Sequence, residues 1–226
     1  FKVWKSLLTE GQASAATAGS VARILLAIHA ATAFDQHIAK QFSTDDLFFA
    51  LRTEPYLLAT AKRHPDVAQQ LSQLADRLMV EKKALVHGDV SPKNILVGAK
   101  GPVILDAECA WYGDPAFDVA FCLNHLLLKC LWRPGASASY LDCFAVITES
   151  YLGGVDWERR EDIERRVAQL LPGLFLGRVD GKSPVEYITE RKDKEKVRRV
   201  AKRFLLEPTG RLKDIRRGWE EELSHE

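Results

Sequence analysis

The stretch Leu85-Val-His-Gly-Asp-Val-Ser-Pro-Lys-Asn-Ile-Leu-Val97, followed by Val103-Ile-Leu-Asp-Ala-Glu108, alternates short aliphatic runs with acidic and amide side chains. Between the two parts stands Gly98-Ala-Lys-Gly-Pro102, which has the composition of a tight turn. Aliphatic and β-branched runs on both sides of such a turn are typical of a β-hairpin. The sequence therefore predicts a hairpin that turns near Ala99 or Lys100.

Oxygen-bearing side chains are expected to meet at the open end of this hairpin. Counting outward from the turn places Asn94 almost opposite Asp106, where facing Cα atoms lie about 4.5 to 5.5 Å apart. Asp89 precedes Asn94 by five positions in a loop, so it can reach the same place. Asn94, Asp106 and the nearby Glu108 offer hard oxygen ligands suited to Mg²⁺. The pattern predicts a magnesium site, with Asp89 free to act on an acceptor.

Two motifs carry a resemblance to a known family. His87-Gly-Asp-Val-Ser-Pro-Lys-Asn94 resembles the catalytic loop of the aminoglycoside phosphotransferase and choline kinase-like family, whose members are related to protein kinases. The stretch 104–120 is similar to the second signature of that family, in the Asp-x-Glu form of methylthioribose kinase-like members. The resemblance implies an ATP-dependent kinase that transfers the γ-phosphoryl group to a hydroxyl of a small molecule.

The resemblance also implies a role for each residue of these motifs. Asp89 would be the catalytic base, while Asn94 and Asp106 would bind Mg²⁺ and the nucleotide. Glu108 would assist at the metal. Phosphoryl transfer depends mostly on positioning and charge neutralisation, so one proton-accepting side chain is sufficient.

Three further positions refine this expectation. The resemblance implies that His87 is an architectural residue of the loop. It also implies that Asp118 is a buried carboxylate that accepts hydrogen bonds from the loop backbone. Ser91 stands two residues after Asp89, where protein kinases usually carry Lys, and this agrees with a small-molecule kinase.

The rest of the chain has helical patterns joined by short links. Apolar residues recur at helical spacing over 14–34, 44–52, 65–82, 136–151, 158–171 and 197–206. A further helix, apolar almost all round, is expected to start at Asp114 and Pro115. The predicted fold class is α+β and predominantly α-helical: the C-terminal lobe of a protein kinase-like fold, with one or two small β-hairpins that carry the active site.

The sequence shows no counterpart of the N-terminal, nucleotide-clamping lobe of such a kinase. That lobe needs a five-stranded sheet and a phosphate-binding Lys, whereas nearly all residues before His87 follow a helical pattern. We therefore expect residues 1–226 to be the catalytic and acceptor-binding lobe of a larger polypeptide. Alone, this lobe is expected to bind ATP poorly and to be inactive.

The composition bears on partners and location. The chain has 32 basic and 31 acidic residues, a formal charge of +1, which gives no reason to expect nucleic acid or a membrane as partner. Its four cysteines lack metal-ligand spacing and are expected to be reduced core thiols of a cytoplasmic protein. The expected partners are ATP and a small-molecule acceptor. An aminoglycoside, choline, methylthioribose, homoserine or another sugar-like alcohol would need the same metal and base.

Two other interpretations stay open at this point. One is a pseudokinase or binding module, although the base and the metal ligands of the motif are all present. The other is a metal-dependent phosphohydrolase. In a hydrolase His87 would be a metal ligand, whereas in a kinase its ring would point toward the backbone of its own loop.

Several other residues could serve either structure or function. His29 and His125 fall on apolar helix faces and are expected to be hydrogen-bonded core residues, while His37 and His64 are expected at the surface. The charged run 190–203 is interpreted as the solvated face of a helix.

The sequence allows two interpretations for each of four more residues. Arg178 and Lys182 either lie near the acceptor pocket or belong to a helix-terminating turn. Trp111 and Tyr112 either line the pocket or pack against the apolar helix.

Overall fold

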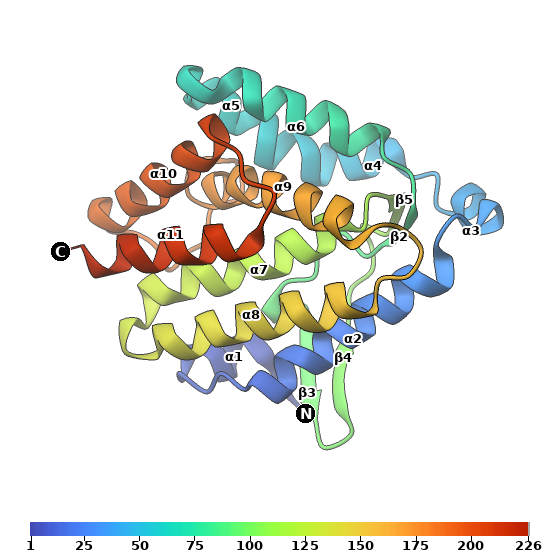
Figure 1. The fold of residues 1–226 in the computed structure, drawn as a ribbon, viewed down its shortest axis with the longest axis horizontal. Coiled ribbons are helices and arrows are strands. Elements are labelled where there is room, and N and C mark those ends of the chain that lie inside the picture. Colours follow the sequence, from blue (N-terminus) through green and yellow to red (C-terminus); the bar gives the residue numbers. More distant parts are fainter. Residues whose placement is uncertain (226) are drawn as a thin grey trace.

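A computed structural model describes residues 1–225 (Figure 1). The helices are α1 Trp4–Thr9, α2 Ala15–Thr32, α3 Gln36–Gln41, α4 Asp45–Phe48, α5 Ala59–Arg63, α6 Ala68–Val80, α7 Ala116–Trp132, α8 Ser137–Gly154, α9 Arg160–Asp180, α10 Arg191–Leu206 and α11 Leu212–Ser224. A π-helical segment, Phe49–Leu58, joins α4 to α5, and 3₁₀ turns span Pro65–Val67, Pro92–Asn94 and Pro134–Ala136. The strands are β1 Lys2–Val3, β2 Ala84–Val86, β3 Ile95–Gly98, β4 Gly101–Ile104 and β5 Trp111–Gly113.

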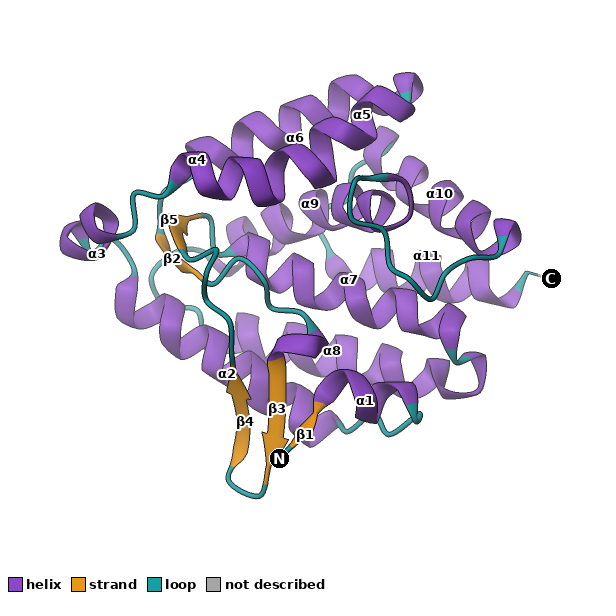
Figure 2. Cartoon of the chain, turned by 180° about the vertical axis from the view of Figure 1, so that it is seen from behind, coloured by secondary structure: helices purple, strands orange, loops and turns teal. Residues whose placement is uncertain are grey.

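The strands form two small antiparallel sheets (Figure 2). β3 pairs with β4 through a tight turn at Ala99 and Lys100, and β1 adds to the other edge of β3. β2 pairs with β5. The predicted hairpin and the position of its turn are therefore confirmed, and so is the predominantly helical α+β fold class.

The hairpin register differs slightly from the count made on the sequence. Ile95 faces Ile104, and the backbone N–H of Leu105 donates to the carbonyl oxygen of Asn94 at 2.8 Å. Leu105, rather than Asp106, therefore stands beside Asn94. Asp106 lies one residue beyond the last paired position, where the chain leaves the hairpin.

The apolar helix predicted after Asp114 and Pro115 is α7, the centre of the fold. Residues 116–130 of α7 are all buried, because the helix packs between α8 and α9 (Figure 1). A helix that is apolar all round is stable only in such a position. Asp114 caps it, since its Oδ1 accepts a hydrogen bond of 3.0 Å from the backbone N–H of Ala116.

Two helical segments extend beyond their predicted ends through a proline. α9 continues through Pro172 to Asp180, and the helical run that begins with α4 continues through Pro55 to the end of α5. Close packing explains the first case, since a Cβ at Gly177 would lie 2.5 Å from the carbonyl oxygen of Tyr56. Tertiary contact thus outweighs the local tendency of proline to end a helix. The short helices α1 and α3 and the C-terminal helix α11 were not predicted.

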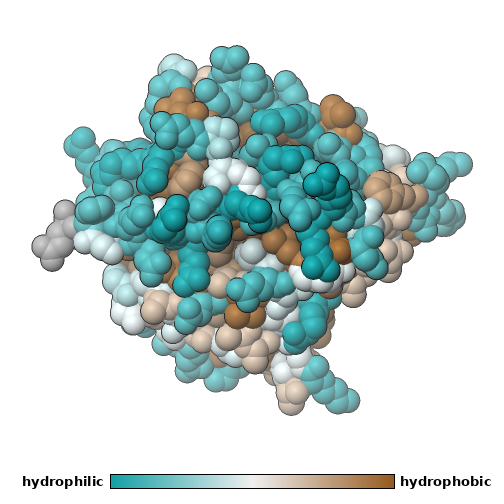
Figure 3. All heavy atoms as spheres, viewed as in Figure 1, coloured by the Kyte–Doolittle hydropathy of each residue, from teal (hydrophilic) through white to brown (hydrophobic). Residues whose placement is uncertain are grey.

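The charged run 190–203 falls on α10, as expected of a solvated helix. Its buried side chains are apolar and lie on one face: Val197, Val200, Ala201, Phe204 and Leu205. Hydrophilic side chains cover most of the molecular face on which α10 lies (Figure 3). By length and composition one helix, α2, could cross a membrane, and its buried face packs against α8.

The predicted burial is confirmed for one histidine and wrong for another. His29 is fully buried, with Nδ1 2.7 Å from the hydroxyl of Tyr151 and Nε2 3.3 Å from Oδ2 of Asp118. His64, predicted at the surface, is also buried, and its Nε2 lies 2.8 Å from Oδ2 of Asp180. The end of α5 meets the end of α9 there, a contact between distant segments that local patterning does not encode.

Acid should weaken the cluster around Asp180, whose carboxylate also accepts two hydrogen bonds of 2.7 Å from Arg198. Burial alone would raise the pKa of Asp180, but the hydrogen bonds from Arg198 and His64 hold it below 3.8. A carboxyl group whose pKa is lowered by folding stabilises the folded state at pH values above its ordinary pKa. This stabilisation is lost as the pH falls through the pKa of the folded state.

We therefore expect Asp180→Asn to lower the free energy of unfolding by about 1 to 3 kcal/mol near neutral pH. The difference from wild type should shrink below about pH 4. Urea denaturation near neutral pH and below about pH 4 measures this difference in the free energy of unfolding. The matched control is Asp156→Asn, because Asp156 is exposed. An equal difference at neutral and acidic pH would contradict the assignment.

Candidate active site

The loop that follows β2 is anchored at its start by the carboxylate of Asp118. Asp118 lies fully buried in the first turn of α7 and accepts hydrogen bonds from the backbone N–H groups of His87, at 2.7 Å, and Gly88, at 2.9 Å. Gly88 has a φ of +80°, and a Cβ there would lie 2.6 Å from the carbonyl oxygen of Cys109. Glycine is therefore required at this turn, and the path of the chain into Asp89 is fixed.

His87 turns its ring toward the loop that carries it. Nδ1 accepts a hydrogen bond of 3.2 Å from the backbone N–H of Asp89. Nε2 is buried and has no hydrogen-bond partner in the part of the chain that the structure describes. The ring thus contacts the backbone beside Asp89.

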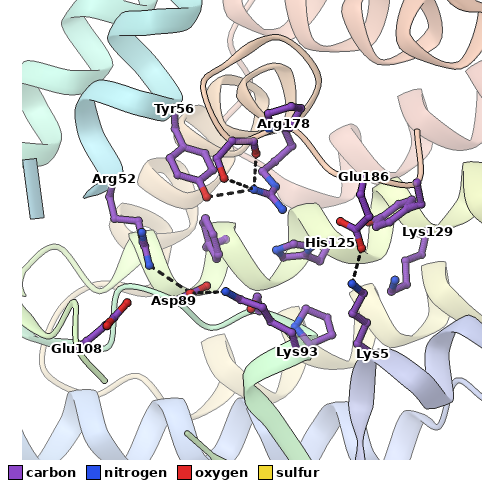
Figure 4. Close-up of a pocket in the computed structure, with 16 residues that line it drawn as sticks. Lys5, Arg52, Tyr56, Asp89, Lys93, Glu108, His125, Lys129, Arg178 and Glu186 are labelled. Atoms are coloured by element: carbon purple, nitrogen blue, oxygen red, sulfur yellow. Dashed lines mark hydrogen bonds and ion pairs between the residues drawn. The ribbon is translucent and has the colours of Figure 1, made fainter. Parts of the chain in front are cut away.

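Asp89 lies in the wall of a cavity of about 310 Å³ (Figure 4). The residue is only 7% exposed, and its Oδ2 lies 3.2 Å from Nη2 of Arg52 and 3.2 Å from Nζ of Lys93. Asp89, which we expected to act on an acceptor, thus forms ion pairs with two cations of the protein. The π-helical segment brings Arg52 to the loop from a distant part of the chain, and no local pattern encodes this contact.

The two cations beside Asp89 differ in how firmly they are held. Arg52 is buried, donates from Nε to the carbonyl oxygen of Gly88, and has its Cζ 5.9 Å from the centre of the Phe121 ring. These contacts hold the guanidinium in one place. The side chain of Lys93 is 59% exposed. Arg52 is therefore the fixed partner of the carboxylate, and Lys93 is the exchangeable one.

The other oxygen-bearing residues lie around the open end of the hairpin. Asn94 is buried, and its Nδ2 donates to the carbonyl oxygen of Asp89 at 3.2 Å, which leaves Oδ1 for a ligand. Asp106 is exposed and has a φ of +68°, a left-handed conformation that Asp tolerates better than most residues. Glu108 is exposed and lines the same cavity as Asp89.

This donor set fits a magnesium ion that arrives with a nucleotide. Among residues 1–225 no group of three or more His, Cys, Asp or Glu side chains is placed to hold a metal by itself. Mg²⁺, however, usually takes one or two protein carboxylates and completes its octahedron with waters and substrate phosphates. Exposed carboxylates at Asp106 and Glu108 and the oriented amide of Asn94 supply oxygen ligands of that kind.

A large part of the cavity wall comes from residues that the sequence did not single out. These belong to α1, the π-helical segment, α7 and the chain after α9: Lys5, Arg52, Tyr56, Phe121, Lys129, Glu186 and Tyr187. Of the four residues considered for the acceptor pocket, Arg178 lines it, donating to the hydroxyl of Tyr56 at 3.1 Å. No local sequence pattern pointed to the others in the wall.

His125 differs from the expectation of a hydrogen-bonded core histidine. It is buried in α7, but it lines the cavity, and its Nε2 has no hydrogen-bond partner among the described residues. The ring packs edge to face on Phe121, with centroids 5.4 Å apart. The apolar helix face predicted the burial of His125 correctly, whereas the cavity beside it depends on tertiary structure.

Three residues left open by the sequence have structural contacts. Trp111 is fully buried and stacks on Phe48 with ring centroids 4.0 Å apart. The hydroxyl of Tyr112 donates to the carbonyl oxygen of Lys83 at 2.9 Å. Lys182 pairs with Glu54 at 2.7 Å. Both aromatic residues are therefore buried, and neither lines the cavity beside Asp89.

Comparison with known proteins agrees with this geometry. Residues 5–161 match the family model described as phosphotransferase enzyme family. The methylthioribose kinase of Yersinia enterocolitica is 28% identical over 162 residues, covering 59% of this chain and 40% of the relative. The methylthioribose kinases of Enterobacter sp. and Pectobacterium atrosepticum are 30% and 31% identical, over 41% and 42% of this chain and 26% of each relative. The chain thus spans two fifths or less of the length of these relatives.

The family match covers well over half of the chain and includes the anchored loop, the hairpin and the start of α7. The resemblance seen in the sequence motifs is therefore confirmed by an independent comparison. This chain belongs to the phosphotransferase enzyme family.

Proposed function

We propose that this chain is the catalytic and acceptor-binding part of a small-molecule kinase that uses ATP and Mg²⁺. The observation that carries the proposal is the position of Asp89: a rigidly anchored loop presents its carboxylate to a cavity of about 310 Å³. Methylthioribose kinases among the relatives support a small hydroxyl compound as acceptor. The reaction is proposed to occur in the cytoplasm, where four free cysteines stay reduced.

In this mechanism Asp89 accepts the proton of the acceptor hydroxyl as that oxygen attacks the γ-phosphoryl group. Arg52 holds the carboxylate in place. Lys93 is exchangeable, so it can leave Asp89 for the incoming phosphoryl oxygens. When bound, Mg²⁺ would be held by Asn94 and Asp106 with help from Glu108, and it would neutralise the phosphate charge.

The position of His87 favours a kinase over a phosphohydrolase. A hydrolase of the kind considered needs this ring as a metal ligand, whereas the ring contacts the backbone N–H of Asp89. A non-catalytic binding module is disfavoured because Asp89, Asn94 and Asp106 are all retained around the cavity and the hairpin end.

The test is a screen for ADP release by the complete polypeptide, with Mg²⁺·ATP and a panel of neutral, cationic and anionic alcohols that includes methylthioribose. The proposal predicts that at least one alcohol raises ADP release above the rate with water alone. If no alcohol in the panel does so, the proposed function is overturned.

A further inference from the structure

The cavity beside Asp89 carries more cationic than anionic side chains. Its cations are Lys5, Arg52, Lys93, Lys129 and Arg178, and its acids are Asp89, Glu108 and Glu186. Lys5 pairs with Glu186, and two of the cations share Asp89. Lys129 and Arg178 have no carboxylate within 4.0 Å in the part of the chain that the structure describes. The cavity therefore holds positive charge that the protein itself does not neutralise.

Lys129 is the more unusual of these two cations. It is 1% exposed in the buried helix α7, and its Nζ lies over the rings of Trp132, at 4.2 Å, and Tyr187, at 4.6 Å. Burial, together with the charge of Lys5, lowers the pKa of Lys129 to about 8. The ammonium is still mostly protonated at neutral pH, and a buried charge without a partner is costly. An anion bound beside it would remove that cost.

Among residues 1–225, three buried polar atoms of the same wall have no hydrogen-bond partner: Nε2 of His125, Nε of Arg178 and the hydroxyl of Tyr187. Native proteins leave few such atoms unsatisfied. Nε of Arg178, like Nζ of Lys129, can only donate a hydrogen bond. Burial and the charges of Arg178 and Lys129 lower the pKa of His125 well below 6.5, so its neutral ring keeps one N–H to donate. The wall therefore presents a surplus of donors.

These donors lie on the far side of Asp89 from Glu108, one of the predicted magnesium ligands. In Figure 4, Glu108 lies on one side of Asp89, while His125 and Lys129 lie on the other. The phosphate end of a nucleotide is expected on the side of Glu108, where the hairpin carries its oxygen ligands. The surplus donors therefore face the acceptor, and an acceptor with cationic groups would be repelled by them.

We propose that the acceptor is an anionic alcohol, with a carboxylate or phosphate group bound by Lys129, Arg178 and His125 while its hydroxyl faces Asp89. This proposal rests on the kinase function proposed above and narrows its substrate class. An anionic group has several acceptor oxygens that can accept from the unused donors, and its charge is opposite to that of Lys129 and Arg178. The cavity volume of about 310 Å³ suits a small metabolite.

The first test measures anion binding without turnover, using inorganic sulfate as the probe. The Tm of the complete polypeptide is recorded in sodium sulfate and in sodium chloride at equal ionic strength. Sulfate stabilises proteins in general, so the rise in Tm caused by sulfate is compared between wild type and the variants. We expect the sulfate-dependent rise in Tm to be larger, by about 2 to 4 °C, in wild type than in Lys129→Met. Lys62→Met, an exposed lysine outside the cavity, serves as the control.

The outcomes of this test are distinct. Equal sulfate effects in wild type and Lys129→Met would overturn the anion site. If Lys129→Met does not fold, Arg178→Gln is used in its place. Arg178 is only half-buried, and this substitution also removes one positive charge from the cavity. A smaller sulfate effect in the variant, with an unchanged effect in Lys62→Met, supports the site.

The second test uses the alcohols that release ADP, with glycerol, glycerate and glycerol 3-phosphate included to separate neutral, carboxylate and phosphate forms. We expect the alcohol with the highest kcat/KM to be anionic, and Lys129→Met to raise its KM at least tenfold, about 1.4 kcal/mol, with a smaller change in kcat. A best acceptor without an anionic group would overturn the inference and leave the kinase intact. ADP release from no alcohol would instead overturn the kinase, and the sulfate test would still decide the anion site.

Discussion

Replacing Asp89 by Asn is expected to reduce phosphoryl transfer by about 10²- to 10⁴-fold while Mg²⁺·ATP binding stays near the wild-type value. Asn keeps the size of the side chain but cannot take up the proton of the acceptor hydroxyl. The effect should be large because Asp89 is the only carboxylate on the loop between His87 and Asn94. The neighbouring cations, Arg52 and Lys93, are donors and cannot act as the base.

Two measurements separate this effect from damage to the fold. ADP release in the presence of an active acceptor gives kcat and KM, and calorimetry gives the affinity for Mg²⁺·ATP. Because Asp89→Asn leaves Arg52 without its ion-pair partner, the Tm is compared with that of the exposed control Asp156→Asn. Turnover within about tenfold of wild type would remove Asp89 as the base.

Replacing Asp106 by Ala is expected to weaken Mg²⁺·ATP binding by about tenfold or more, because it removes a charged oxygen ligand. The change also has a backbone component. Asp106 has a φ of +68°, and Ala adopts this conformation less readily than Asp or Asn. Asp106→Asn therefore serves as the matched variant, since it removes the charge but tolerates the left-handed backbone.

Calorimetric titration of both Asp106 variants with Mg²⁺·ATP checks this assignment. We expect both to bind more weakly than wild type, with similar affinities if the loss of charge dominates. Wild-type affinity in Asp106→Asn would show that the charge of Asp106 does not contribute to metal binding. Weak binding in Asp106→Ala alone would assign the effect to the backbone.

The parts of the fold that could be predicted from the sequence have local causes. The hairpin followed from two aliphatic runs around a glycine-rich turn, and α7 followed from a cap and an uninterrupted apolar run. The anchored loop followed from a family motif, and four of its residues, Asp89, Ser91, Pro92 and Lys93, line the cavity. In each case a few neighbouring residues determine the outcome.

The parts that could not be predicted depend on contacts between distant segments. Arg52, on the π-helical segment, contacts Asp89 on a loop that lies far away in the sequence. His64 is buried because α5 meets the end of α9. Lys129 is a charged residue in an otherwise apolar stretch of sequence, and its lack of a carboxylate partner among residues 1–225 is visible only in the assembled cavity.

The most direct test of the central claim follows the fate of the γ-phosphoryl group by phosphorus NMR. The complete polypeptide is incubated with Mg²⁺·ATP and the alcohol that gives the fastest ADP release. A kinase predicts a phosphate monoester resonance that grows in step with ADP, and Asp89→Asn should abolish this growth. Inorganic phosphate as the only product, or monoester formation by Asp89→Asn at the wild-type rate, would contradict the account.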